Sequence, residues 1–222
     1  MDRIVIKVLT VEREYGCGGG DIARQLADRL RWTLWDQRLT SEIARLSSCE
    51  RAAVEEREER VDPLYYRLFK SILRGSFEGS LNVHRLELLD ADTILRLTER
   101  LVREAASAGQ CVIVGRGSQH FLRDRADTLR VFLYGPRQDK IRRLLASGVS
   151  ESRVEQLVDT VDTDRAAFVK KYFNLEWPNR PIYHAMFNTA VGDEIVIAGV
   201  LSLKHSLDEP SVRDGAPAST SR

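Results

Sequence analysis

Residues 4–30 read IVIKVLTVEREYGCGGGDIARQLADRL. The first eight, from Ile4 to Val11, are rich in β-branched residues and almost continuously apolar, which is typical of a strand buried on both faces. Four of the five residues from Gly16 to Gly20 are glycine. After them, apolar residues recur on one face of a helix, at positions 22, 23, 26, 27 and 30. The sequence therefore predicts a buried strand, a glycine-rich loop and the start of an amphipathic helix.

A glycine loop in this position favours a phosphate site. Without Cβ atoms the backbone can wrap an anion, and its N–H groups point inward with the positive end of the helix dipole behind them. We expect Gly16, Cys17, Gly18, Gly19 and Gly20 to contact phosphate. The alternative is a flexible turn with no ligand.

Two known motifs match the loop only in part. The P-loop requires GxxxxGK[ST]. Here we take Gly19 as the lysine position and Asp21 as the Ser/Thr position. The dinucleotide motif requires GxGxxG and an acidic residue about 20 positions on. Gly16, Gly18 and Asp36 fit that pattern, but Asp21 replaces its third glycine.

The rest of the chain alternates between strands and helices. Short apolar runs predict strands at 33–35, 111–114, 129–134 and 183–188, and periodic runs predict helices at 92–108, 137–146 and 150–172. Residues 37–109 have no strand pattern, residues 192–205 fit a strand or a helix, and residues 206–222 have the composition of a disordered tail. This alternation predicts an α/β fold with a mostly parallel sheet and ligand sites at the carboxyl ends of the strands.

Composition excludes several classes of protein. Lys and Arg number 34 and Asp and Glu 33, so the net charge of +1 is too small for a protein that coats nucleic acid or an acidic membrane. No apolar run approaches the roughly 20 residues of a membrane span. The N-terminus does not resemble a signal peptide. Three cysteines without a CxxC pair suit a reducing cytosol, so we expect a cytoplasmic protein with no structural zinc.

Several motifs together resemble the cytidylate kinase-like family, a branch of the P-loop nucleoside monophosphate kinases. Residues 11–19, VEREYGCGG, are similar to its opening SREYGSGG, and residues 112–117, VIVGRG, to its IVGRG. Residues 130–136, RVFLYGP, are similar to its RVFIYAP strand. Further matches, to its "D…RA…Y" and "W…Y…NT" patterns, are Asp162, Arg165, Ala166, Tyr172, Trp177, Tyr183, Asn188 and Thr189.

The resemblance implies a three-layer P-loop kinase fold, with a mostly parallel five-stranded sheet and helices on both faces. It implies a single domain at 1–205, with a helical acceptor-binding insert at 37–109 and a lid-like helical region at 137–180. It makes residues 192–205 a closing helix. The implied activity is transfer of the γ-phosphoryl group of ATP, with Mg²⁺, to a pyrimidine nucleoside monophosphate; the partners are small-molecule nucleotides.

The missing lysine directs attention to arginines. Arg13, Arg116 and Arg165 are candidate catalytic cations, because guanidinium binds phosphate in a bidentate way, and Arg142 is a candidate nucleotide contact. The alternatives are a surface salt bridge of Arg13 with Glu12 or Glu14, an exposed turn for Arg116, and a structural ion pair of Arg165 with Asp162.

Two carboxylates and one thiol complete the candidate set. Asp36 could orient the acceptor or cap a helix, and Asp21 could hold Mg²⁺ through water, repel the nucleotide or cap its helix. Cys17 could have a lowered pKa at a helix N-terminus or simply replace a serine. Two other functions stay open: a non-catalytic nucleotide-binding regulator and a dinucleotide-binding oxidoreductase.

Overall fold

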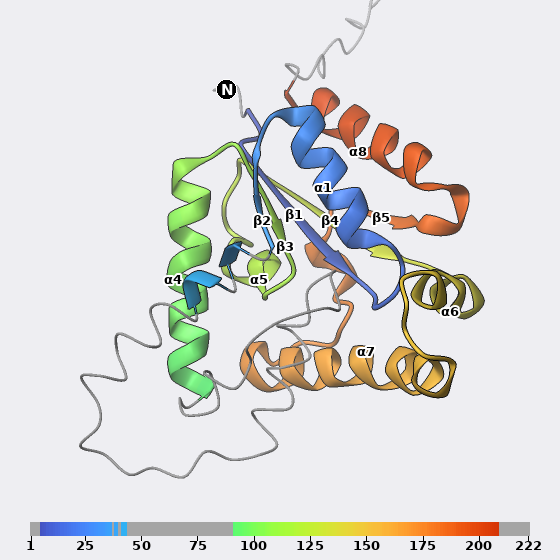
Figure 1. The fold of residues 1–222 in the computed structure, drawn as a ribbon. Helices are drawn as coiled ribbons and strands as arrows, with labels where there is room; N and C mark the ends of the chain where they lie inside the picture. The colour runs from blue at the N-terminus through green and yellow to red at the C-terminus, as the bar shows by residue number, and fades with distance from the viewer. Residues whose placement is uncertain (1–4, 37, 40, 44–90, 209–222) are drawn as a thin grey trace, which may run out of the picture.

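The computed structural model describes residues 5–36, 38–39, 41–43 and 91–208. In these ranges the chain forms a five-stranded parallel sheet in the order β2-β3-β1-β4-β5 (Figure 1). The strands are β1 (Val8–Arg13), β2 (Thr33–Trp35), β3 (Cys111–Val114), β4 (Thr128–Tyr134) and β5 (Ala185–Asn188). The predicted number of strands is confirmed for the described residues, and all of their pairings are parallel.

Helices cover both faces of the sheet. The described helices are α1 (Gly19–Leu30), α4 (Ala91–Ala108), α5 (Ser118–Phe121), α6 (Arg137–Ala146), α7 (Glu151–Phe173) and α8 (Asp193–Asp208), with 3₁₀ turns at Arg180–Ile182 and Thr189–Val191. One apolar core joins the sheet to α1 and α8, and a second joins it to α4, α5 and the end of α7. The result is the predicted α/β architecture of three layers.

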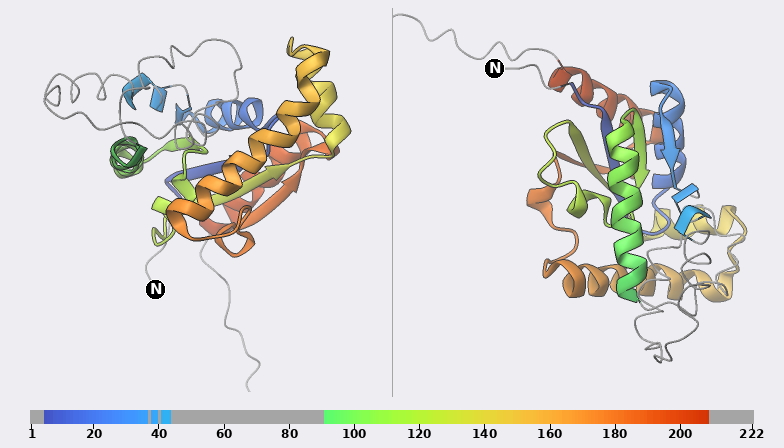
Figure 2. Two further views of the ribbon diagram at one scale, coloured as in Figure 1. Left: turned by 90° about the horizontal axis from the view of Figure 1, so that it is seen from below. Right: turned by 90° about the vertical axis from the view of Figure 1, so that its left-hand side faces the viewer.

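Helix α7 crosses the carboxyl ends of the strands, below the sheet in Figure 1 and across the molecule in Figure 2. A third apolar cluster joins it to α6 and to Tyr15, just before the glycine loop. Because β1 pairs with β3 and β4 in parallel, the carboxyl ends of these three strands lie side by side next to α7. Residues that follow β1 and β3 are thereby brought together.

Several boundaries differ from the sequence predictions. Strand β1 continues to Arg13, two residues beyond the predicted end, because the polar side chains of Glu12 and Arg13 are buried and bonded inside the protein. Residues 192–205 are confirmed as mainly helix, in α8. That helix extends to Asp208, three residues into the segment predicted to be disordered. Residues 209–222 and most of the predicted insert lie outside the described residues.

Among the described residues no helix is both long and apolar enough to span a membrane.

Candidate active site

The glycine loop joins β1 to α1 and needs its glycines. Gly16 and Gly18 have φ of 77° and 81°, in the left-handed region that side chains disfavour. A Cβ on Gly16 would lie 2.8 Å from Cδ1 of Leu144, so α6 packs directly on the loop. Gly18 is the N-cap of α1, and no side chain caps that helix. The first amides of α1 therefore remain available to an anion.

Arg13 is buried beside this loop, only 4% exposed. Its guanidinium lies against Gly115, at the end of the neighbouring strand β3, and a Cβ on Gly115 would collide with Nη1. The ion pair with Glu12 joins Nη1 to Oε1 at 3.8 Å, and both side chains are buried. The surface salt bridge considered from the sequence is therefore wrong, because neither partner lies at the surface.

Glu12 positions this cation. Its Oε1 accepts a hydrogen bond from the backbone N–H of Arg13 at 3.1 Å, and its Oε2 accepts one from Nε2 of Gln119 at 2.6 Å. A buried carboxylate is costly unless it is paired. Glu12 is held from two sides and faces Arg13, so the end of β1 carries a fixed pair of opposite charges.

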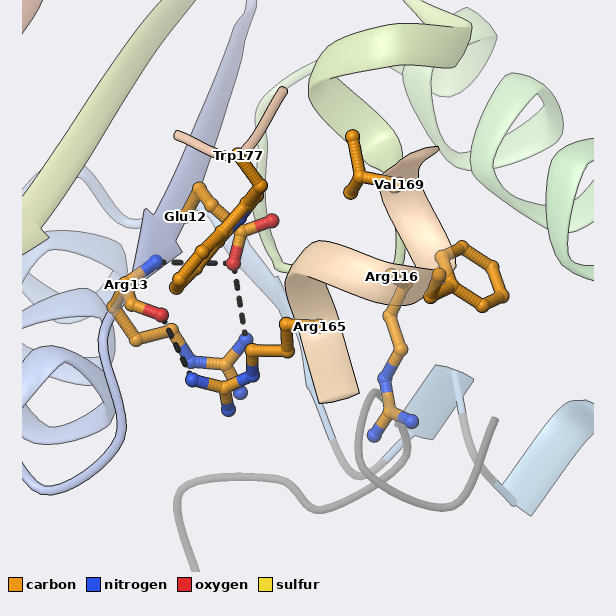
Figure 3. A pocket seen from close by; sticks show the side chains of 8 residues that line it. Glu12, Arg13, Arg116, Arg165, Val169 and Trp177 are labelled. Carbon is orange, nitrogen blue, oxygen red and sulfur yellow. Dashed lines mark hydrogen bonds and ion pairs between the residues drawn. The ribbon is translucent and has the colours of Figure 1, made fainter. Parts of the chain in front are cut away.

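Arg165 reaches the same point from α7. Its Nη1 donates to the backbone carbonyl of Arg13 and to Oδ1 of Asp162, both at 2.9 Å. Burial lowers the pKa of Arg165, the nearby charge of Arg13 lowers it further, and Asp162 opposes both effects. The ion pair with Asp162 that the sequence allowed is present. It holds Arg165 against the backbone carbonyl of Arg13, and this contact is drawn as a dashed line in Figure 3.

Arg116 and Asp36 form a second charged group. Arg116 follows β3 in a turn where residues 115–117 all have positive φ, and its own φ is 62°. This conformation is strained for a residue with a side chain, and such strain clusters at functional sites. Burial lowers the pKa of Arg116 to about 10, against the opposing effect of Asp36, so it stays protonated at neutral pH. Its Nη2 lies 4.0 Å from Oδ1 of Asp36, at the end of β2.

A small cavity lies between these groups (Figure 3). Its volume is about 10 Å³, roughly the room that one water needs. Three arginines from three elements line it, opposed by one carboxylate, and the other walls are apolar. The lining residues are Glu12, Arg13, Arg116, Gly117, Arg165, Phe168, Val169 and Trp177. The lining itself holds more positive than negative charge, although Asp36 and Asp162 pair with two of the arginines outside it, and such a lining suits an anion.

A lysine also enters the network from α6. The ammonium of Lys140 donates to Oε2 of Glu14 at 3.0 Å and to Oδ2 of Asp162 at 3.4 Å. Burial disfavours this charge, yet the two carboxylates outweigh burial and raise the pKa of Lys140. Oδ1 of Asp162 also accepts a hydrogen bond from the backbone N–H of Tyr15 at 2.9 Å. Helices α6 and α7 are thus bonded to the residues that open the glycine loop.

The two adjacent arginines of α6 lie differently. Arg142 is exposed and pairs with Asp139 at 2.5 Å. Arg143 lies against the loop, since a Cβ on Gly18 would collide with its Nη1. Two hydrogen bonds, at 3.2 and 2.6 Å, hold its guanidinium to Asp193 at the start of α8. Arg143 is therefore better placed at the loop than Arg142.

Asp21 and Cys17 lie at the two sides of the α1 N-terminus. The carboxylate of Asp21 is more than half exposed and pairs with Arg24 at 3.0 Å. In the described ranges, no three His, Cys, Asp or Glu side chains gather as a metal site. Cys17 is buried, and burial raises the pKa of its thiol to about 11. The lowered pKa considered for Cys17 is therefore not found, and the residue fills the position that serine has in the family motif.

Sequence reasoning gave Glu12 and Glu14 only as possible partners of Arg13, and it did not identify Lys140 or Gln119. It placed Arg142 and Arg143 near the lid but gave the phosphate contact to Arg142. One signal was available for Glu12. In a strand that continues to Arg13, Glu12 shares a face with Val8 and Thr10 and must be buried with them. Nothing in the sequence separates Arg143 from Arg142, because their difference depends on how α6 is turned against the loop.

The comparisons with known proteins identify a family and agree with the fold. A family model described as the cytidylate kinase-like family matches residues 8–191. No curated protein matches the chain significantly. An uncharacterized protein from Eubacterium ventriosum is 19% identical, with a TM-score of 0.64 over 92% of this chain and 99% of that one. Shikimate kinase from Acinetobacter baumannii is 16% identical, with a TM-score of 0.50 over 91% and 95%. TT1252 from Thermus thermophilus is also 16% identical, with a TM-score of 0.51 over 90% and 98%.

Proposed function

The chain belongs to the cytidylate kinase-like family, and on that premise we propose that it is a phosphotransferase that moves the γ-phosphoryl group of ATP to a nucleoside monophosphate, by resemblance a pyrimidine one. The observation that carries the proposal is the meeting of three buried guanidinium groups beside a glycine loop. Arg13, Arg116 and Arg165 come from β1, the turn after β3 and α7. Phosphoryl transfer requires positive charge and positioning, with little covalent chemistry by the protein.

The charges fall into two groups that suit two substrates. Arg13 and Arg165 lie together next to the glycine loop, where we place the phosphates of ATP. Arg116 and Asp36 lie at the ends of β3 and β2, where we place the acceptor. An oxygen of the acceptor phosphate attacks the γ-phosphorus, the bond from that phosphorus to the β–γ bridging oxygen breaks, and ADP leaves. The arginines stabilise the charge that spreads over the transferred group.

Magnesium is the cofactor that this reaction implies. It would neutralise charge on the phosphates, and it commonly takes only one or two carboxylates besides phosphate oxygens and water. Asp21 opens α1 next to Gly20 with an exposed carboxylate, which is compatible with a water-mediated contact. We therefore keep Asp21 as the proposed residue that holds Mg²⁺ through water.

A test of this assignment compares the wild type with Asp21→Ser by calorimetry. We expect ATP affinity of the wild type to fall sharply in excess EDTA, because the carboxylate and the phosphates then repel, and to fall less in Asp21→Ser. Arg24→Ala is the matched control, since it removes the partner of Asp21 and keeps the carboxylate. Equal ATP affinity of the wild type with and without metal would exclude the role.

The oxidoreductase alternative conflicts with the strand order. Dinucleotide-binding folds place β1 beside β2, in the order 3-2-1-4-5-6. Here β3 lies between them. The non-catalytic alternative has the same fold and must be separated by experiment.

The deciding experiment measures thermal stability and ADP formation with ATP, Mg²⁺ and a panel of nucleoside monophosphates. A bound ligand raises stability by RT ln(1+[L]/Kd). The proposal expects stabilisation by ATP and turnover with at least one pyrimidine monophosphate. Stabilisation without turnover would establish a nucleotide-binding regulator. Thermal stabilisation by NAD alone would instead support the oxidoreductase hypothesis.

A further inference from the structure

Arg13, at the end of β1, and Gly19, at the start of α1, differ from the P-loop motif in opposite ways. When Gly18 is set on the second glycine of GxxxxGK[ST], the first glycine falls at Arg13, the lysine at Gly19 and the Ser/Thr at Gly20, one position before Asp21. A cation therefore stands where the motif has glycine, and a glycine stands where the motif has its cation.

The structure shows that these two positions compete for the same space. A Cβ on Gly19 would lie 2.7 Å from Cβ and 2.9 Å from Cγ of Arg13, closer than real Cβ atoms approach other atoms. The Cβ of Arg13 cannot move away, because it is fixed to the backbone of β1. With this backbone, a side chain on Gly19 would therefore have to displace the loop or the strand that carries Arg13.

The guanidinium of Arg13 continues from this point to Gly115, which also lacks the Cβ that would block it. It is thereby placed between the glycine loop and the end of β3. Although the residue is only 4% exposed, Nη2 of Arg13 has no hydrogen-bond partner among the described residues. A buried guanidinium N–H without a partner is costly, and a ligand oxygen would remove that cost.

From these observations we infer that the loop cation is transposed: Arg13 does the work of the P-loop lysine and contacts the β- and γ-phosphates, with Gly19 and Gly115 keeping its path open. The inference rests on the proposed function and names the residue that binds the donor phosphates. Glu12 pairs with Nη1 of Arg13, and Arg165 donates to the backbone carbonyl of Arg13. Neither contact uses Nη2, which is left for the ligand.

The test restores the ordinary motif by exchanging the two residues. We compare the wild type, Arg13→Gly, Gly19→Lys and the double variant, and measure ATP and inorganic pyrophosphate affinity by calorimetry. Arg13→Gly should weaken ATP binding by about ten- to a hundredfold, the range for one charge-assisted phosphate contact. Gly19→Lys alone should lower the melting temperature, because its Cβ meets the Arg13 stem. The double variant should recover most of the lost affinity.

Two further variants keep the test decisive if Arg13→Gly does not fold. Arg13→Met keeps the stem between the two glycines and removes only the charge. It should weaken ATP and ADP binding far more than AMP binding, whereas a purely structural role would weaken all three alike. The control is Arg103→Ala, which removes an exposed arginine on α4. It should change no affinity.

The outcomes separate the inference from the proposed function. A double variant that binds no better than Arg13→Gly would overturn the transposition, as would equal losses for AMP and ATP in Arg13→Met. If the wild type binds pyrophosphate but no nucleotide, the proposed function fails. The pyrophosphate affinities of the same variants then decide whether Arg13 replaces the loop lysine. If the wild type binds neither anion, both are overturned.

Discussion

The glycine loop after β1 and the turn after β3 are neighbours with opposite designs. In the first, positive φ falls on Gly16 and Gly18, and the loop itself presents bare backbone to a ligand. In the second, the strained position between two glycines is occupied by Arg116, with φ of 62°. One turn supplies N–H groups and the other a fixed cation. A loop without a lysine is here surrounded by buried arginines on adjacent elements, which the backbone holds in place.

The largest effect is expected for Gly18→Val, which should disrupt the phosphate site of the glycine loop. Valine is strongly disfavoured at a φ of 81°, and its Cβ would collide with the guanidinium of Arg143. We expect the variant to fold and to lose all nucleotide-induced thermal shift. The control is Gly148→Val, because Gly148 has a φ of 94° with open space around it. It should lose stability to strain but keep the shift, and an unchanged shift in Gly18→Val would mean that the loop is only a turn.

The second turn is tested by Arg116→Ala. Alanine would have the same strained backbone conformation but would lack the guanidinium of Arg116, a residue that is only 2% exposed. We expect kcat to fall by about 10²–10³, the range for one strong transition-state contact. Arg116→Lys should recover part of this loss, because the charge returns without the planar fork. A rise in acceptor KM with kcat intact would contradict the role in transfer and assign Arg116 to acceptor binding alone.

These two turns also show how far the sequence could lead. The sequence predicted α6 at its observed bounds, Arg137–Ala146, as a basic helix that follows Gly135 and Pro136. The glycine run and VIVGRG predicted both turns, since glycine readily takes the positive φ that such turns require. Packing decided the rest. The burial of Glu12 depends on Gln119, more than a hundred residues away, and the pairing of Lys140 depends on how α6 and α7 meet.

A smaller effect should separate the two adjacent arginines of α6. We expect Arg143→Ala to weaken nucleotide binding about tenfold, because it removes a cation held beside Gly18 by Asp193. Arg142→Ala removes an exposed pair with Asp139 and should change affinity by less than about twofold. Calorimetry on the pair provides its own control, since the charge change is identical. The reverse order would return the nucleotide contact to Arg142, as the sequence first suggested.

The smallest effect is expected at Cys17, inside the glycine loop itself. Its Sγ donates to the carbonyl of Leu133 at 3.6 Å, and the pKa of its thiol is raised to about 11 by burial. At pH 8 roughly one thiol in a thousand is then ionised, so Cys17 should resist iodoacetamide in the folded protein. Serine can make the same hydrogen bond, and Cys17→Ser should keep activity within about twofold. Peptide mapping after alkylation measures the first expectation and steady-state kinetics the second. Rapid labelling of Cys17 would mean that the loop opens widely in solution, and a large loss in Cys17→Ser would give the thiol a role that a buried, protonated sulfur does not explain.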